Sequence, residues 1–165
     1  MSRLDSFIRR LCAQRDCLAL GAKLIAEVPG PVLEFGLGNG RTYDHLRGLL
    51  SGREIFVFDR RIAAHPDCIP DPEHMLLGEL RDTLPRAGER IRVPAAFAHF
   101  DIGLVDAAAN AALCAFVAHW APPLMADGGV VASDQELSAP GWLPLPLPNG
   151  VAEGRYFMYR ATGTS

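Results

Sequence analysis

Hydrophobic residues recur along the chain at two different spacings, and each spacing predicts a different kind of element. Over residues 3–27 they recur at helical intervals, which predicts one or two amphipathic helices that end before Pro29. Short continuous apolar runs, typical of strands covered on both faces, then alternate with helical stretches. The predicted strands are residues 31–35, 55–58, 75–77, 101–105 and 130–132. Helices are predicted at residues 43–50, directly after residue 77, and at 108–120, whereas 61–73 and 86–99 are expected to be irregular.

Strands and helices that alternate in this way favour right-handed βαβ units. We therefore predict an α/β fold with a doubly wound, mostly parallel sheet and helices on both of its faces. The segments 142–148 and 155–160 are extended and joined by a short glycine-containing link, which predicts a C-terminal antiparallel hairpin. Prolines at every second position of the first segment remove backbone donors from one side, so this strand is predicted to lie at an edge. We expect a single domain over residues 1–165, with residues 1–28 as an N-terminal helical segment.

Composition narrows the class of protein only slightly. The 165 residues are 49% hydrophobic and carry a net charge of −3, so no field of positive charge would gather a nucleic acid. Charges interrupt every apolar run near the N-terminus, so neither a secretory signal nor a membrane-spanning helix is expected. The four scattered cysteines form no C-x-x-C pair and are expected to be reduced, which favours a cytoplasmic location.

The strongest chemical signal is the run V-L-E-F-G-L-G-N-G-R-T that follows the N-terminal helices. Gly36, Gly38 and Gly40 fall where the first strand turns into a helix, and glycine lets the backbone approach a ligand closely there. Glycines also serve plain tight turns, but three of them at every second position after a buried strand favour a ligand site. The dinucleotide fingerprint G-x-G-x-x-G/A fails, because Arg41 or Tyr43 occupies its last position.

Two acidic residues indicate which ligand this turn binds. Glu34 lies at the carboxyl end of the first strand, where a carboxylate would repel a pyrophosphate but would suit a ligand with an ammonium and a sulfonium group. Asp59 ends the second strand, where an acid can accept hydrogen bonds from both hydroxyls of a ribose. Asp59 could instead cap a helix or pair with Arg60 or Arg61. Two carboxylates that face one cavity favour S-adenosylmethionine as the ligand.

These motifs make the chain similar to the class I S-adenosylmethionine-dependent methyltransferases over roughly residues 28–161. The family's first motif, acid-x-G-x-G-x-G, matches the sequence from Glu34 to Gly40, and its acid after the second strand matches Asp59. The resemblance implies a seven-stranded sheet in the order 3-2-1-4-5-7-6, closed by the antiparallel hairpin. It also implies S-adenosylmethionine as the cofactor.

The resemblance further assigns residues to parts of the cofactor. It implies that the turn at Gly36–Gly38 holds the methionine moiety, that Asp59 binds the ribose, and that the Thr42 hydroxyl reaches the cofactor carboxylate. It places the end of the third strand beside the adenine, and Asp106, after the fourth strand, beside the methyl group. The residues expected at the cofactor are Glu34, Gly36, Leu37, Gly38, Gly40, Thr42, Asp59, Arg60, Gly78, Glu79, Leu80 and Asp106.

Departures from the family's patterns bear on the reaction. Members that methylate planar amino groups carry Asn/Asp-Pro-Pro-aromatic after the fourth strand. This chain has D-A-A-A-N from Asp106 to Asn110, which argues against a nitrogen of adenine, cytosine or glutamine as the acceptor. Metal-dependent catechol-type members use acids that match Asp106 and Asp134, beside Gln135, and such ligands would suit magnesium. The alternative is that Asp106 lines the cofactor pocket and Asp134 caps a turn, and we assign no metal ligand.

We therefore predict an enzyme, a methyltransferase that passes the methyl group of S-adenosylmethionine to a small-molecule acceptor, without a nucleic-acid or membrane partner. The protein's task would be mainly alignment. No catalytic residue is assigned, because the five histidines are dispersed. The acceptor site would come from the N-terminal helices, residues 61–73, residues 86–99 or a neighbouring subunit, and a homo-oligomer is left open. Two other classes stay open: a protein that senses S-adenosylmethionine without catalysis, and a nicotinamide-dependent oxidoreductase.

Overall fold

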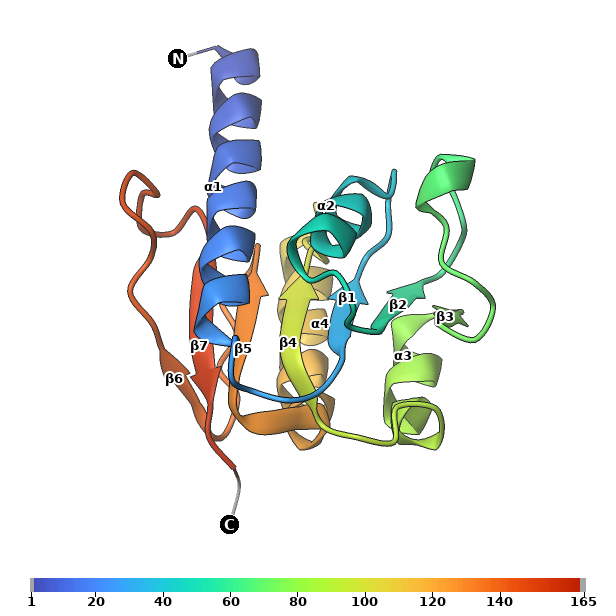
Figure 1. The fold of residues 1–165 in the computed structure, drawn as a ribbon. Helices are drawn as coiled ribbons and strands as arrows, with labels where there is room; N and C mark the ends of the chain where they lie inside the picture. Colours follow the sequence, from blue (N-terminus) through green and yellow to red (C-terminus); the bar gives the residue numbers. More distant parts are fainter. Residues whose placement is uncertain (1, 164–165) are drawn as a thin grey trace.

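A computed structural model describes residues 2–163 of the chain, and it is built around one seven-stranded sheet (Figure 1). The strand order is β3-β2-β1-β4-β5-β7-β6, as predicted. β7 pairs antiparallel with both β5 and β6, and the other pairs are parallel, so the predicted C-terminal hairpin is confirmed. The strands are β1 (Val32–Phe35), β2 (Ile55–Asp59), β3 (Met75–Leu77), β4 (Ala95–Phe100), β5 (Met125–Ser133), β6 (Trp142–Pro144) and β7 (Phe157–Ala161).

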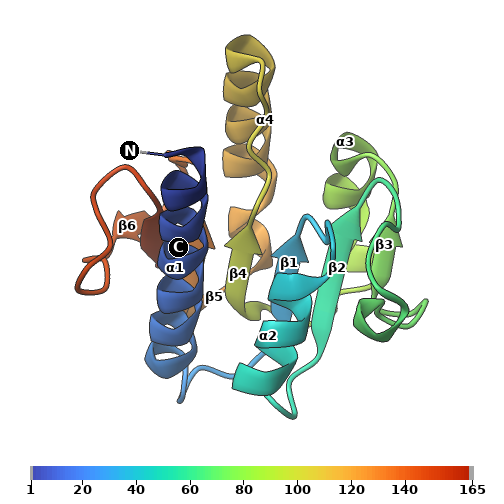
Figure 2. The same ribbon diagram turned by 90° about the horizontal axis from the view of Figure 1, so that it is seen from above.

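Helices cover both faces of the sheet. Figure 2 shows α1 and α2 on one face and α3 and α4 on the other. The α-helices are α1 (Arg3–Leu24), α2 (Arg41–Leu49), α3 (Leu80–Thr83) and α4 (Ala107–Trp120). Short 3-10 helices follow at η1 (Pro66–Cys68), η2 (Leu84–Glu89) and η3 (Pro122–Leu124). No helix in residues 2–163 combines the length and the apolar character that crossing a membrane requires.

The N-terminal segment is one continuous helix. Its start is fixed by a capping box, in which the Ser2 hydroxyl accepts from the Asp5 backbone N–H and the Asp5 carboxylate accepts from the Ser2 N–H. Further along, Gly21 brings α1 so close to the sheet that a Cβ there would overlap the ring of Phe97 on β4. The N-terminal half of α1 extends beyond the carboxyl ends of the parallel strands (Figure 1), which brings its side chains over that edge of the sheet.

The position of the fourth strand corrects the prediction made from sequence. β4 spans Ala95–Phe100, and all but its last residue fall in the segment 86–99 that was expected to be irregular, while residues 101–105 form a loop instead of the predicted strand. The sequence A-A-F-A-H-F lacks the β-branched residues typical of strands and contains a histidine, so its pattern is weak. All six residues are nevertheless buried, because β4 lies in the middle of the sheet with helices on both sides.

Candidate functional site

A glycine turn joins β1 to α2 at the carboxyl edge of the sheet. Gly36, Gly38 and Gly40 have φ angles of 97°, 50° and 84°, a conformation that L side chains rarely adopt. A Cβ at Gly36 would lie 2.5 Å from the backbone oxygen of Asp101, and a Cβ at Gly40 would overlap Cys68. A Cβ at Gly38 would meet no protein atom within 4 Å. Gly36 and Gly40 therefore permit close packing of the chain, whereas Gly38 leaves the turn open to a ligand.

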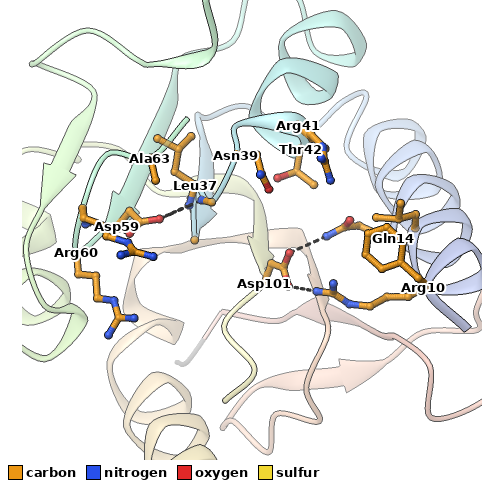
Figure 3. A pocket seen from close by; sticks show the side chains of 15 residues that line it. Arg10, Gln14, Leu37, Asn39, Arg41, Thr42, Asp59, Arg60, Ala63 and Asp101 are labelled. Carbon is orange, nitrogen blue, oxygen red and sulfur yellow. Dashed lines mark hydrogen bonds and ion pairs between the residues drawn. The ribbon is translucent and has the colours of Figure 1, made fainter. Parts of the chain in front are cut away.

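Asp59, the last residue of β2, fastens this turn to the second strand (Figure 3). Its Oδ2 accepts hydrogen bonds from the backbone N–H groups of Leu37 (2.9 Å) and Gly38 (3.1 Å). Its Oδ1 accepts one from the N–H of Arg61 (3.1 Å). An ionised carboxylate offers about four acceptor sites, so Asp59 keeps capacity for a further hydrogen bond. Its predicted place at the end of the second strand is confirmed.

Two adjoining pockets lie along the carboxyl edge of the sheet. The first, of about 510 Å³, lies between the N-terminal half of α1, the glycine turn and the chain after β2, and we call it the α1-side pocket. The second, of about 420 Å³, lies between the ends of β1 and β2, the chain after β3 and the loop after β4, and we call it the α3-side pocket. Gly36, Asp59, Arg60 and Asp101 line both pockets, which therefore form one cleft. The strand order reverses between β1 and β4, the usual ligand site of an open α/β sheet.

The cleft brings together most of the residues predicted from sequence. Those on the α1-side pocket are Gly36, Leu37, Gly38, Thr42, Asp59 and Arg60. Those on the α3-side pocket are Gly36, Asp59, Arg60, Gly78, Glu79 and Leu80. Three predicted residues line neither pocket: Glu34, Gly40 and Asp106.

Glu34 lies on the same face of the sheet as Asp59, but only Asp59 lines the cleft, so the prediction that both carboxylates face one cavity is wrong. Glu34 is fully buried, with its Oε2 2.6 Å from Nδ1 of His99. The Thr42 hydroxyl donates to the other carboxylate oxygen, so this hydrogen is directed at Glu34 and not at a ligand in the pocket. The second ring nitrogen of His99 is hydrogen-bonded to the buried hydroxyl of Tyr156.

The pKa values of two groups in this buried network are shifted from their ordinary values. Burial lowers the pKa of His99, but the charge of Glu34 and its hydrogen bond outweigh burial, so the pKa is raised above the ordinary value. When the ring is protonated, it donates from both nitrogens, to Glu34 and to Tyr156. Burial raises the pKa of Tyr156 well above its usual range, which keeps the phenol neutral. Sequence reasoning missed the network, since His99 and Tyr156 are 57 positions apart.

Asp101, which follows β4, is a second site residue that sequence reasoning missed. Its Oδ1 is 2.5 Å from Nη2 of Arg10, and its Oδ2 accepts from Nε2 of Gln14 at 3.2 Å (Figure 3). Both partners come from α1, so the contact ties this helix to the cleft. A signal was present in the sequence: both β2 and β4 run into the dipeptide Phe-Asp at their carboxyl ends.

The two acids considered for a metal have structural partners. Asp106 is the N-cap of α4, where its Oδ1 accepts from the backbone N–H of Ala109 at 2.7 Å, and it lines neither pocket, which argues against its predicted place beside the methyl group. Asp134 accepts from the N–H groups of Ile102 and Gly103, both at 3.1 Å, and so holds the loop after β4. Burial raises the pKa of Asp134. In residues 2–163, no group of three or more His, Cys, Asp or Glu side chains is arranged to hold a metal ion.

An acid-anchored glycine turn below a cleft, at the point where a 3-2-1-4-5-7-6 sheet reverses its strand order, defines a nucleoside-binding α/β fold of the class I methyltransferase type. Comparison with known proteins agrees. The chain matches the model of the S-adenosyl-L-methionine methyltransferase family over residues 1–161, and it belongs to that family. It is therefore an enzyme that uses S-adenosylmethionine as its methyl donor.

A solved structure supports the assignment. The crystal structure of an S-adenosyl-L-methionine methyltransferase from Silicibacter pomeroyi DSS-3 is similar to this chain, with a TM-score of 0.90 and 42% sequence identity. The match covers 97% of this chain and 98% of that one. No curated protein sequence matches the chain.

Proposed function

We propose that this methyltransferase acts on a small-molecule acceptor that binds in the α1-side pocket, while the nucleoside part of S-adenosylmethionine binds in the α3-side pocket. The observation that carries the proposal is that the two pockets meet at a shared border of four residues. A volume of about 510 Å³ is in the usual range of small-molecule sites. Pockets that share a border allow two ligands to touch, which direct transfer of a group between them requires.

The residues of the cleft fit this cofactor. Asp59 keeps acceptor capacity for a ribose hydroxyl, and Gly38 leaves room above the turn for the methionine part. Leu80, Ile102 and Leu113 give the α3-side pocket apolar surface suited to a purine. When bound, S-adenosylmethionine supplies a methyl group that its sulfonium has already activated.

The chain's own contribution is orientation. Asp101 lies at the border of the two pockets, with both carboxylate oxygens held by side chains of α1. A carboxylate fixed in this way can accept a hydrogen bond from the acceptor's nucleophilic group and orient it. The part of α1 that supplies Arg10 and Gln14 also forms one side of the pocket.

The ribose assignment is tested by Asp59→Ala. Removing a charged hydrogen-bond partner should weaken binding of S-adenosylhomocysteine by about 1–3 kcal/mol. Isothermal titration calorimetry measures this loss, and circular dichroism establishes that the variant is folded. The matched control is Asp127→Ala, which removes an aspartate near the amino end of β5 whose one hydrogen bond among residues 2–163 is accepted from the Gly163 N–H. A folded Asp59→Ala variant with the affinity of the control would exclude Asp59 as the ribose ligand.

The acceptor class is tested by incubating the enzyme with methyl-labelled S-adenosylmethionine and separate pools of small metabolites, proteins and nucleic acids. We expect the label to enter the small-molecule pool. Label that enters only protein or nucleic acid would contradict the proposed acceptor class while leaving the methyltransferase assignment intact.

A further inference from the structure

Positive charge is concentrated around the α1-side pocket, although the whole chain has a net charge of −3. Four arginines and two aspartates line the pocket, which leaves an excess of two positive charges there. The arginines are Arg10, Arg41, Arg60 and Arg61, and the acids are Asp59 and Asp101. The excess is therefore local to this pocket and does not follow from the composition of the chain.

Both acids of the pocket and one of its arginines already form hydrogen bonds or an ion pair within the protein. Asp101 is paired with Arg10 at 2.5 Å and accepts a second hydrogen bond from Gln14. Asp59 accepts three hydrogen bonds from backbone N–H groups, two of them in the glycine turn. Neither acid is thus directed at the remaining arginines.

The side chains of Arg41, Arg60 and Arg61 form no hydrogen bond or ion pair with another residue in the part of the chain that the structure describes. All three are exposed. Figure 3 shows Arg41 at the start of α2 on one side of the pocket and Arg60 after β2 on the other. A guanidinium offers a planar fork of donors that matches a carboxylate or a phosphate, so these side chains are suited to an anionic ligand.

The cofactor does not neutralise this charge. S-adenosylmethionine carries one carboxylate, one ammonium and one sulfonium group, a net charge of +1, so its binding increases the local positive excess. Its carboxylate needs only one cationic partner or the N-terminus of α2, and at least two arginines are left without an anion. The second ligand of the cleft can supply negative charge to these arginines.

We propose that the methyl acceptor is a small organic anion whose carboxylate or phosphate group pairs with Arg41, Arg60 and Arg61 of the α1-side pocket. The inference rests on the proposed function, since it places the acceptor in that pocket. Phe7 and Leu11 of α1 line the same pocket and provide surface for an apolar part of the acceptor. An aromatic or aliphatic acid, or a phosphate ester, combines these two features.

The test uses the full chain saturated with S-adenosylhomocysteine and titrated by calorimetry with three probes: benzoate, phenyl phosphate and benzamide. Benzamide has nearly the shape of benzoate without its charge. We expect at least one of the two anions to bind at least about tenfold more tightly than benzamide, as the loss of a charge-assisted pair predicts. Comparing benzoate with phenyl phosphate then distinguishes a carboxylate from a phosphate.

A double variant, Arg41→Gln with Arg61→Gln, assigns the effect to the pocket. It should weaken anion binding at least about tenfold, whereas S-adenosylhomocysteine should still bind, because Asp59 and the glycine turn are unaltered. The control, Arg86→Gln with Arg92→Gln, makes the same change in net charge at exposed positions outside the α1-side pocket and should leave anion binding intact.

The outcomes separate the inference from the function on which it rests. If S-adenosylhomocysteine binds but neither anion binds more tightly than benzamide, the acceptor is not anionic and the inference is wrong. Equal anion binding by the two double variants would also overturn it. Failure of S-adenosylhomocysteine to bind the unaltered chain would overturn the proposed function itself, and the inference with it.

Discussion

His99 and Phe100 are neighbours on β4, but their side chains enter opposite faces of the sheet. Phe100 stacks on Phe35, with ring centroids 4.2 Å apart, and Phe35 stacks on Phe58 at 4.3 Å, under α3 and α4. His99 lies under α1 and α2, between the Glu34 carboxylate and a buried phenol. One face is therefore a plain apolar core, whereas the other contains a fully buried ionic network below the glycine turn.

On the apolar face, stability depends on how well the side chains fill the available volume. On the other face, it depends on which buried polar groups are paired. An apolar core tolerates substitutions that keep its volume, because neighbouring side chains can repack. A buried charge must keep its partner, since an unpaired charge in the interior is strongly disfavoured. The network also contains Thr42, which lines the cleft, so the same face that carries the ionic pair supports the ligand site.

The largest effect is expected for His99→Leu. It leaves the Glu34 carboxylate buried without its cationic partner and Tyr156 without a bond to the ring. Breaking a buried pair in this way costs about 3–5 kcal/mol of unfolding free energy. Chemical denaturation followed by circular dichroism measures the loss.

The matched control is Phe100→Leu, which replaces a ring by leucine at the next position but on the apolar face. It should cost about 1–2 kcal/mol, less than His99→Leu, because it loses a ring stack and some volume but leaves no charge unpaired. Adding Glu34→Leu to His99→Leu removes the orphaned carboxylate and should recover part of the lost stability. Equal losses for the two single variants would show that the two faces do not differ in the way the structure indicates.

Part of the contribution of His99 to the free energy of unfolding should depend on pH. Its pKa is raised on folding, against burial, by Glu34 and to a lesser extent by Asp101 and Asp134, while Tyr156 stays neutral. A raised pKa means that the stabilisation is fully present below the unfolded value of about 6.5 and is lost as the pH rises through the folded value. The unfolding free energy of the unaltered protein should therefore fall as the pH rises above about 6.5.

The reference for this measurement is the double variant with leucine at both Glu34 and His99, in which neither group titrates. Burial also raises the pKa of Asp134, so its contribution falls as the pH rises from about 3.9 in both proteins, and only its smaller coupling to His99 differs between them. The stability gap between the two proteins should narrow with rising pH. A gap that is constant from about pH 6 to 9 would mean that folding leaves the pKa of His99 unchanged, and a gap that widens with rising pH would mean that His99 is neutral in the folded state.

The sequence predicted the elements whose patterns are strong and missed those that depend on distant contacts. The apolar runs of β1 and β2, the glycine turn and Asp59 were all recognisable, because their signals lie within a few consecutive residues. β4 was missed, since its alanines and histidine become strand only through pairing with β1 and β5. Because of that one error, the prediction assigned the acid after the fourth strand to Asp106, whereas the strand is followed by Asp101.

Asp106→Ala therefore distinguishes an N-cap of α4 from a residue of the cofactor site. Its expected effect is the smallest of the variants considered. Asp106 caps α4, which covers the apolar face, and loss of an N-cap costs about 1 kcal/mol of unfolding free energy. The affinity for S-adenosylhomocysteine should not change, because Asp106 lines neither pocket. Denaturation and calorimetry on the same sample measure both quantities. The reverse result, full stability with affinity about tenfold weaker, would return Asp106 to the cofactor site, because an N-cap that only stabilises α4 predicts the opposite pattern.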